Sequence, residues 1–171
     1  VPVHEPRARA ILRWLVREKI IEEQLSTCGG TGNRMAYAIG EGARKVVERP
    51  ELLPYDKAVN GLEVITKRCI YTPLDDFLEE AGCPQCRREV GVALFESLEE
   101  WMPGQTDNFI CPLCAHEDDI NGFLFLQPCA FSNLGFIFNN WAEAGLRPAF
   151  VEEFGARLGF AVRQVWVDDP A

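Results

Sequence analysis

Two copies of one four-residue motif constrain this chain more than any other feature. Cys83-Pro84-Gln85-Cys86 and Cys111-Pro112-Leu113-Cys114 are separated by 24 residues. Two residues between cysteines allow a tight turn to direct both sulfurs at one point, and the proline fixes φ within that turn. Four thiolates about 2.3 Å from a common ion form the tetrahedral site typical of structural zinc. We therefore predict one structural Zn2+ ion bound by Cys83, Cys86, Cys111 and Cys114.

The motif pair resembles the zinc-ribbon family, whose knuckles commonly read Cys-Pro-x-Cys. The resemblance covers residues 83–114 and implies the metal and its four cysteine ligands. The chain departs from the family after each pair, where Arg87 and Ala115 stand in place of the usual glycine. The spacer between the pairs also has a helical period where a compact ribbon has strands. We expect a zinc-ribbon-like knuckle pair that is inserted into a larger domain.

A single Cys-Pro-x-Cys ahead of a helix is also typical of thioredoxin-like redox proteins, which lower a thiol pKa in this way. That fold would place a strand before Cys83, whereas Leu74–Ala81 has a helical pattern, and it leaves the second motif without a role. Four thiolates close the coordination sphere of zinc, so no position remains for water or substrate. The sequence thus disfavours zinc catalysis, although it does not exclude an enzyme.

One histidine near the second motif and three further cysteines could also bind a metal. His116, two residues past Cys114, could replace a cysteine or support one, but we expect it to be exposed. Cys69 and Cys129 fall in apolar segments and are predicted to be small buried residues. Cys28 opens a glycine-rich loop. Their roles, like that of His116, are not settled by the sequence.

Composition and charge narrow the class of protein. The 171 residues fit one domain, and 47% apolar with 25% charged residues is average for globular proteins. No apolar run approaches the ~20 residues of a membrane span, and the N-terminal residues lack the pattern of a signal peptide. Cysteines grouped in metal motifs suit a reducing compartment. We expect a cytoplasmic protein that has no membrane contact.

The net charge of −9 is unevenly distributed. Residues 1–50 carry nine Lys or Arg against six Asp or Glu, whereas residues 51–171 carry eight against twenty. From Glu89 to Leu146 there is no Lys or Arg at all. Because phosphate binding depends on Lys and Arg, nucleic acid is a poor partner for this half. The acidic stretch instead favours a basic protein partner.

Hydrophobic periods and turn residues predict an α+β fold. We expect a single domain over residues 1–171, with an N-terminal segment 1–72, a zinc-knuckle region 73–119 and an aromatic-rich β-α-β segment 120–171. The last segment should contain a small antiparallel sheet built from two neighbouring strands. Predicted helices are Pro6–Gln24, Asn33–Glu48, Pro73–Ala81, Val90–Trp101 and Arg147–Leu158. Predicted strands are Leu62–Tyr71, Ile120–Leu126, Phe131–Phe138 and Phe160–Val167.

Two further features carry alternative hypotheses. The loop at Gly29–Gly32 could present backbone N–H groups to an anion, with Arg34 nearby, but the established phosphate-loop and dinucleotide fingerprints fail. Cys28 as a nucleophile would have only His4 or His116 as a base. The C-terminal aromatics are predicted to form one core, and Trp141, after the polar pair Asn139-Asn140, is the first candidate among them for a surface residue.

The leading hypothesis is a small non-catalytic, zinc-stabilised protein that binds a protein partner through its acidic and aromatic C-terminal half. The first alternative is an enzyme or binder of a phosphorylated or nucleotide ligand at Gly29–Gly32. The second is a nucleic-acid-associated zinc-ribbon protein that uses a basic N-terminal helix containing Arg7, Arg9, Arg13 and Arg17.

Overall fold

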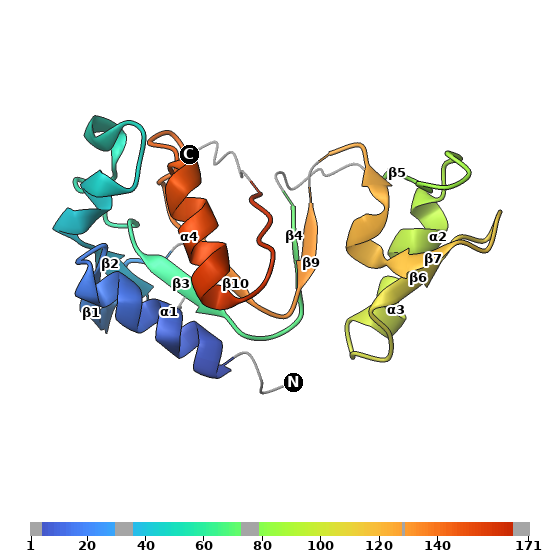
Figure 1. Ribbon diagram of the computed structural model, residues 1–171, viewed down its shortest axis with the longest axis horizontal. Coiled ribbons are helices and arrows are strands. Elements are labelled where there is room, and N and C mark those ends of the chain that lie inside the picture. The colour runs from blue at the N-terminus through green and yellow to red at the C-terminus, as the bar shows by residue number, and fades with distance from the viewer. Residues whose placement is uncertain (1–4, 30–35, 73–78, 128, 166–171) are drawn as a thin grey trace. The chain divides into compact units, whose positions relative to one another are not determined.

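The computed structural model describes residues 5–29, 36–72, 79–127 and 129–165 (Figure 1). Its helices and small antiparallel sheets give the predicted α+β class. The chain divides into two compact units: unit 1 joins residues 1–67 to 133–162, and unit 2 joins residues 68–132 to 163–171. These boundaries differ from those of the three predicted segments, because each unit combines distant parts of the chain. That the units act as one domain stays a prediction.

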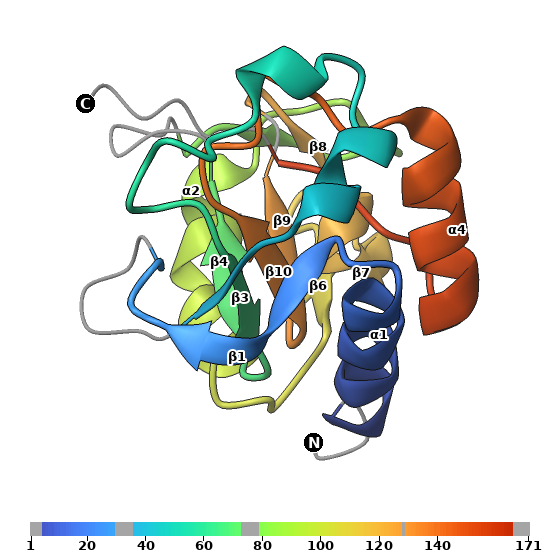
Figure 2. The same ribbon diagram turned by 90° about the vertical axis from the view of Figure 1, so that its left-hand side faces the viewer.

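Unit 1 is a four-stranded antiparallel sheet covered by two helices. The strand order is β1-β2-β3-β10, with β1 at Ile21–Ser26, β2 at Ala36–Ile39, β3 at Leu62–Ile65 and β10 at Gly135–Phe138. Helices α1 (Glu5–Arg17) and α4 (Pro148–Leu158) pack side by side (Figures 1 and 2). The described part of unit 1 also contains the 3-10 helices η2 (Glu41–Lys45) and η3 (Pro50–Leu52).

Aromatic side chains join the two helices to the sheet. Trp14 of α1 stacks on Phe150 of α4 with ring centroids 5.6 Å apart, and Phe154 meets Phe136 of β10 at 4.9 Å. Trp141 is only 1% exposed, and its Nε1–H donates to the Asn60 carbonyl oxygen at 2.9 Å. The prediction that Trp141 lies at the surface is therefore wrong, because this hydrogen bond satisfies its polar atom inside the core.

Helix α1 ends earlier than the apolar period suggested. Lys19 takes a left-handed conformation (φ 60), the Ile20 N–H donates to Leu15 O at 2.9 Å, and the Lys19 N–H donates to Val16 O at 2.9 Å. This is the Schellman C-cap, and the buried Ile20 and Leu15 belong to the same core. The predicted helix Pro6–Gln24 thus stops at Arg17, and its last residues belong to β1.

The predicted helix Asn33–Glu48 is also wrong over its described part, which forms β2 and η2. The glycines that interrupt it have a packing reason. A Cβ at Gly40 would lie 2.1 Å from Lys19 O, and one at Gly42 would lie 2.2 Å from Glu18 O. Only glycine lets this segment approach the end of α1 so closely.

The described residues of unit 2 form three separate two-stranded antiparallel ladders and two short helices. The pairs are β4 (Cys69–Tyr71) with β9 (Ala130–Ser132), β5 (Ala81–Gly82) with β8 (Leu124–Phe125), and β6 (Asn108–Ile110) with β7 (Glu117–Asp119). The helices are α2 (Gly91–Glu96) and α3 (Leu98–Trp101), followed in the chain by the 3-10 helix η4 (Ile120–Gly122). Buried residues including Val90, Leu94, Trp101, Phe109 and Phe131 form its core.

Two other predicted helices agree with the structure, whereas the predicted strand Leu62–Tyr71 and the predicted helix Pro73–Ala81 do not over their described parts. The helix predicted at Val90–Trp101 corresponds to α2 and α3, and that at Arg147–Leu158 is α4, which Gly159 ends at φ 84. Leu62–Tyr71 is divided between β3 and β4, in different units. Within Pro73–Ala81, residues 73–78 lie outside the described part and Ala81 begins β5.

The predicted C-terminal sheet is wrong in its pairing. The segments Ile120–Leu126 and Phe131–Phe138 do not pair with each other: β8 pairs with β5, β9 with β4, and β10 with β3. The described part of Phe160–Val167, residues 160–165, forms no strand. The buried aromatics therefore belong to two cores, one in each unit, whereas Phe160 is exposed. Among the described residues, no helix is long and apolar enough to cross a membrane.

Candidate metal centre

The structure brings together the four cysteines that the sequence singled out. The Sγ atoms of Cys83, Cys86, Cys111 and Cys114 all lie within 4.8 Å of one another. Cys83 Sγ lies 3.6 Å from Cys114 Sγ, and Cys86 Sγ lies 3.8 Å from Cys111 Sγ. Four sulfurs 2.3 Å from a tetrahedral zinc ion would stand about 3.8 Å apart. The cluster could therefore hold a metal ion of this kind.

Strand β5 leads into the first knuckle, and a network of backbone hydrogen bonds folds it. The Cys83 N–H donates to Arg88 O at 3.1 Å, and the Arg87 N–H donates to Cys83 O at 2.9 Å. The N–H groups of Gln85 and Cys86 point at Cys83 Sγ, at 3.4 and 3.5 Å. Such amide donors favour the thiolate that a metal requires.

The second knuckle repeats this arrangement at the tip of the β6–β7 hairpin. The Cys111 N–H donates to His116 O at 2.8 Å, and the Ala115 N–H donates to Cys111 O at 2.9 Å. The Leu113 N–H points at Cys111 Sγ at 3.4 Å. The same offsets between donor and acceptor occur in both turns, so the repeated motif produces a repeated backbone geometry.

The residue after each knuckle adopts a left-handed conformation. Arg87 has φ 63 and Ala115 has φ 65. A side chain in this region costs roughly 1–2 kcal/mol, which glycine avoids. This geometry explains physically why glycine suits the position, and it shows that Arg87 and Ala115 occupy strained sites.

The knuckles join the cluster to the core of unit 2. Cys83 and Cys111, the first cysteine of each pair, are buried, whereas Cys86 is half-buried and Cys114 is exposed. Cys83 and Cys111 pack in the same core as Leu94 and Trp101. A metal ion at this point would thus tie two hairpins and the α2–α3 helices together.

The sulfurs differ in their affinity for protons. The pKa of Cys86 is lowered to about 6, first because of the Arg88 backbone N–H, with burial opposing. Burial raises the pKa of Cys83, but the N–H groups of Cys86 and Gln85 lower it by more. The His116 backbone N–H lowers the pKa of Cys114, yet burial and the neighbouring thiols raise it to about 11. Metal binding must displace the protons that remain on the thiols, so the affinity for the metal falls as the pH is lowered.

The redox interpretation fits this geometry poorly. Strand β5 does precede Cys83, where a helix had been predicted. However, α2 begins only at Gly91, so Cys86 does not lie at a helix N-terminus that would activate it. Both Cys-Pro-x-Cys motifs also contribute sulfurs to one cluster.

The other candidate residues lie apart from the four-cysteine cluster. His116 is half-buried rather than exposed; its Nε2 lies 3.7 Å from Asp118 Oδ2, and its ring faces Phe123 with centroids 6.1 Å apart. Its carbonyl oxygen nevertheless helps to close the second knuckle. Cys129 is buried as predicted, but Cys69 is only half-buried.

The structure describes only the beginning of the glycine loop. Residues 30–35, including most of Gly29–Gly32 and Arg34, lie outside the described part, so a ligand site there stays a hypothesis. Cys28 is buried, its Sγ accepts a hydrogen bond from Ser26 Oγ at 3.1 Å, and a Cβ at Gly61 would lie 2.4 Å from that sulfur. This packing favours a structural role for Cys28.

One buried acid was missed by the sequence analysis. Glu63 of β3 is 1% exposed, and the Asn139 side chain donates to its Oε2 at 2.9 Å. The signal was a charged residue within the apolar run Leu62–Ile65, which pointed to a specific partner.

No protein-family model, curated protein or solved structure matches the chain. The fold and the site alone therefore define the class: an α+β protein with a four-cysteine cluster that could bind a metal ion.

Proposed function

We propose that this chain is a non-catalytic binding protein whose unit 2 is stabilised by one structural zinc ion. The observation that carries the proposal is the convergence of four sulfurs from two hairpin turns, with sulfur–sulfur distances of 3.6 and 3.8 Å. Four thiolates in a tetrahedron suit zinc or iron among the common metals, and zinc needs no redox partner. The zinc-ribbon resemblance of residues 83–114 supports the same assignment.

A structural role follows from the ligand set. Four cysteines leave zinc no open position, so the ion supplies folding free energy rather than catalysis. Structural zinc contributes on the order of 10 kcal/mol or more in small zinc modules at neutral pH. Unit 2 benefits from such a link because its ladders contain only two or three residues per strand.

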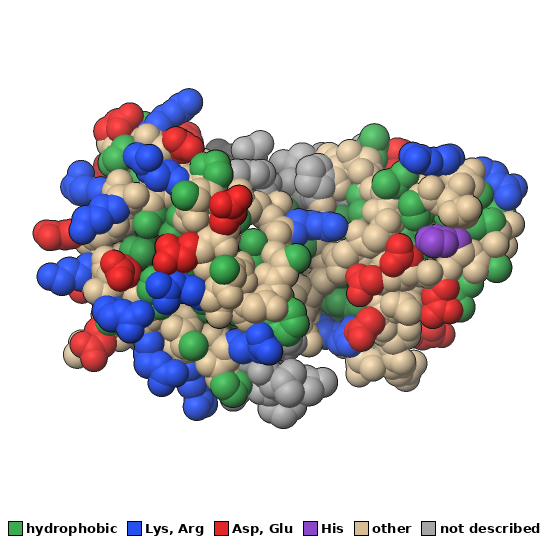
Figure 3. All heavy atoms as spheres, viewed as in Figure 1, with side chains coloured by type: hydrophobic (Ala, Val, Ile, Leu, Met, Phe, Trp, Pro, Cys, Tyr) green, Lys and Arg blue, Asp and Glu red, His purple; other side chains and the backbone are tan. Residues whose placement is uncertain are grey.

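The partner that we propose is a basic protein. Unit 2 carries four Lys or Arg against fourteen Asp or Glu, whereas unit 1 carries thirteen against twelve. On the face shown in Figure 3, acidic side chains gather beside the purple histidine, in the region that Figure 1 labels β6 and β7. A negatively charged surface attracts cationic partners and speeds their association.

The β6–β7 hairpin offers an apolar contact within this acidic surface. Ile110 is 56% exposed and pairs across the hairpin with Glu117, while Asn108 pairs with Asp119. Because these four residues share one face of the ladder, an exposed isoleucine lies among carboxylates. Such a combination suits a basic segment that has an apolar anchor. We place the protein in the cytoplasm, where free cysteines remain available for a metal.

The test has two parts. Metal analysis of protein purified without added metal should give one zinc per chain. Binding of a synthetic Lys/Arg-rich peptide should then weaken when Glu117 and Asp119 are replaced by lysine, and it should weaken with salt. The matched control is Glu22→Lys with Glu23→Lys on β1 of unit 1, where both acids are exposed. Equal loss in both double variants would remove the acidic hairpin from the proposal, and absence of zinc would remove its structural basis.

A further inference from the structure

Helix α1 is rich in exposed arginine. From Pro6 to Arg17 the sequence contains four arginines and no acid; acidic residues resume at Glu18. Among its described side chains, the exposed ones are Pro6, Arg7, Arg9, Ala10, Arg13 and Arg17. Its large apolar residues Ile11, Trp14 and Leu15 are buried in the core of unit 1.

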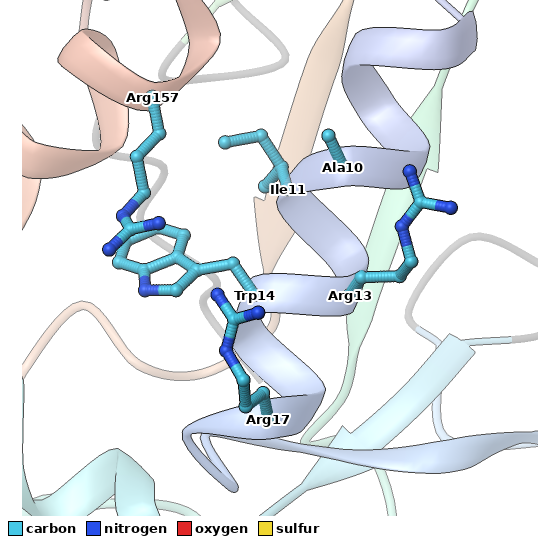
Figure 4. Close-up of a pocket in the computed structure, with 6 residues that line it drawn as sticks. All are labelled: Ala10, Ile11, Arg13, Trp14, Arg17 and Arg157. Atoms are coloured by element: carbon cyan, nitrogen blue, oxygen red, sulfur yellow. The ribbon is translucent and has the colours of Figure 1, made fainter.

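Arginines from two helices surround one open depression of about 350 Å³. Arg13 and Arg17 of α1 and Arg157 of α4 line it together with Ala10, Ile11 and Trp14. Figure 4 shows the Arg17 and Arg157 side chains extending toward the Trp14 ring, while Arg13 projects from the other side of α1. The depression thus brings the guanidinium groups of Arg17 and Arg157, which are far apart in the sequence, toward one ring, while the Arg13 guanidinium points away from it.

These arginines differ in how they are held. Arg157 lies over the Trp14 ring, 4.6 Å from its centroid, and donates from Nε and Nη2 to Glu153 Oε1, both at 3.1 Å. Arg13 and Arg17 make no hydrogen bond or ion pair with any residue that the structure describes. Arg7 is already engaged, because its Nη1 donates to Leu158 O at 2.7 Å. The free cationic capacity therefore lies at Arg13 and Arg17, beside a fixed Arg157.

The chemistry of this surface argues against several kinds of anionic partner. An interfacial membrane helix needs exposed large apolar residues, which α1 buries. A peptide partner needs apolar anchors at its centre, and among the described side chains of α1 the exposed apolar ones are the small Pro6 and Ala10. The exposed ring of Phe160 is faced by the Arg7 guanidinium, 4.4 Å from its centroid. Pockets for small ligands bury most of the ligand's surface and are lined mainly by apolar side chains, whereas this depression is open and three of its six lining residues are arginines. Binding here must be almost wholly electrostatic, which requires a ligand of high charge density.

We propose that the arginine face of α1 and α4 binds the phosphate backbone of a nucleic-acid duplex without reading its sequence. Every cation on this face is an arginine, whose planar fork matches phosphate oxygens in a bidentate manner. Arg9, Arg13 and Arg17 follow one another at four-residue steps, so they form one row along the helix. The only aromatic ring in the depression, Trp14, is 4% exposed and cannot stack on bases. This proposal is independent of the zinc site and concerns a surface outside the cation-free stretch Glu89–Leu146.

The number of phosphate contacts determines how strongly the affinity for a duplex should depend on salt concentration. Contacts from Arg13, Arg17 and Arg157 would neutralise about three phosphates, so log Kobs should fall with log[salt] at a slope of about −2.7. Affinity should therefore drop roughly 40-fold between 50 and 200 mM salt. Replacing Arg13 and Arg17 by glutamine should bring the slope to about −0.9. The control pair Lys57→Gln and Lys67→Gln, exposed elsewhere in unit 1, should leave the slope unchanged.

The experiment is fluorescence anisotropy of labelled DNA and RNA duplexes with the full zinc-loaded chain over a salt series. The Arg13→Lys with Arg17→Lys variant should retain the slope, because it keeps both charges. Circular dichroism verifies that each variant is folded. The proposal is overturned if duplex binding is absent at 50 mM salt, or if the control pair loses as much affinity as the arginine pair. It is also overturned if polyglutamate or anionic vesicles bind as tightly as the duplexes with the same arginine dependence.

Discussion

Ala115 offers a sharp test of the knuckle geometry. It follows Cys114 at φ 65, a conformation that costs a residue with a Cβ roughly 1–2 kcal/mol. Glycine removes this strain but loses more backbone entropy on folding, about 0.5–1 kcal/mol. The Ala115→Gly variant should therefore have a folding free energy that is more favourable by roughly 0.5–1 kcal/mol. Since zinc binding and folding of the knuckles are linked, this gain should appear as zinc affinity about two- to fivefold higher, measured by chelator competition.

The matched control makes the same chemical change where glycine has no advantage. Ala93 lies within α2 and has an ordinary helical conformation, so Ala93→Gly should destabilise the unit by about 1 kcal/mol. The two substitutions are thus expected to have opposite signs. If Ala115→Gly weakened zinc binding as much as Ala93→Gly, the left-handed turn could not be the strained position that we describe.

Three further predictions concern the core, a buried thiol and the metal. Leu94→Ala removes a side chain that is 0% exposed in the core of unit 2. Urea titrations should show the free energy of unfolding of unit 2 lowered by about 2–5 kcal/mol, and a loss below about 1 kcal/mol would contradict the core position of Leu94. Burial raises the pKa of Cys129 to about 11, so its stabilising contribution is complete below the ordinary thiol pKa and is lost as pH rises from about 9 to 11. Wild-type protein should lose more stability than Cys129→Ala over that range, and equal losses would refute the raised pKa. Removal of zinc by a chelator should abolish amide exchange protection in β6 and α2 while α1 and α4 stay protected; uniform protection after metal loss would argue against a structural ion.

The parts that the sequence predicted well depend on local signals. The two Cys-Pro-x-Cys motifs specify the knuckle turns through neighbouring residues, and the four sulfurs do converge. Helix α4 has Pro148 at its first turn and Gly159 just past its end, so both of its bounds were readable. The charge asymmetry was equally visible, and the excess of acids falls mainly in unit 2, although the cation-free stretch Glu89–Leu146 extends into unit 1.

The parts that the sequence missed depend on contacts between distant segments. Strand β3 pairs with β10, about seventy residues later, and neither strand carries information about its partner. Strands of two to four residues are too short to show a period. Trp141 was misplaced because only the folded chain brings the Asn60 carbonyl oxygen to its Nε1. Arg157 of the cationic depression was missed for the same reason, since α4 meets α1 only in the fold.

The central claim is that four cysteine sulfurs share one zinc ion. Zinc K-edge X-ray absorption on the purified protein measures this directly, through the number, identity and distance of the ligand atoms. We predict one zinc per chain with four sulfur neighbours at about 2.3 Å. Nitrogen or oxygen atoms among the nearest neighbours, or fewer than four sulfurs, would contradict the site formed by Cys83, Cys86, Cys111 and Cys114.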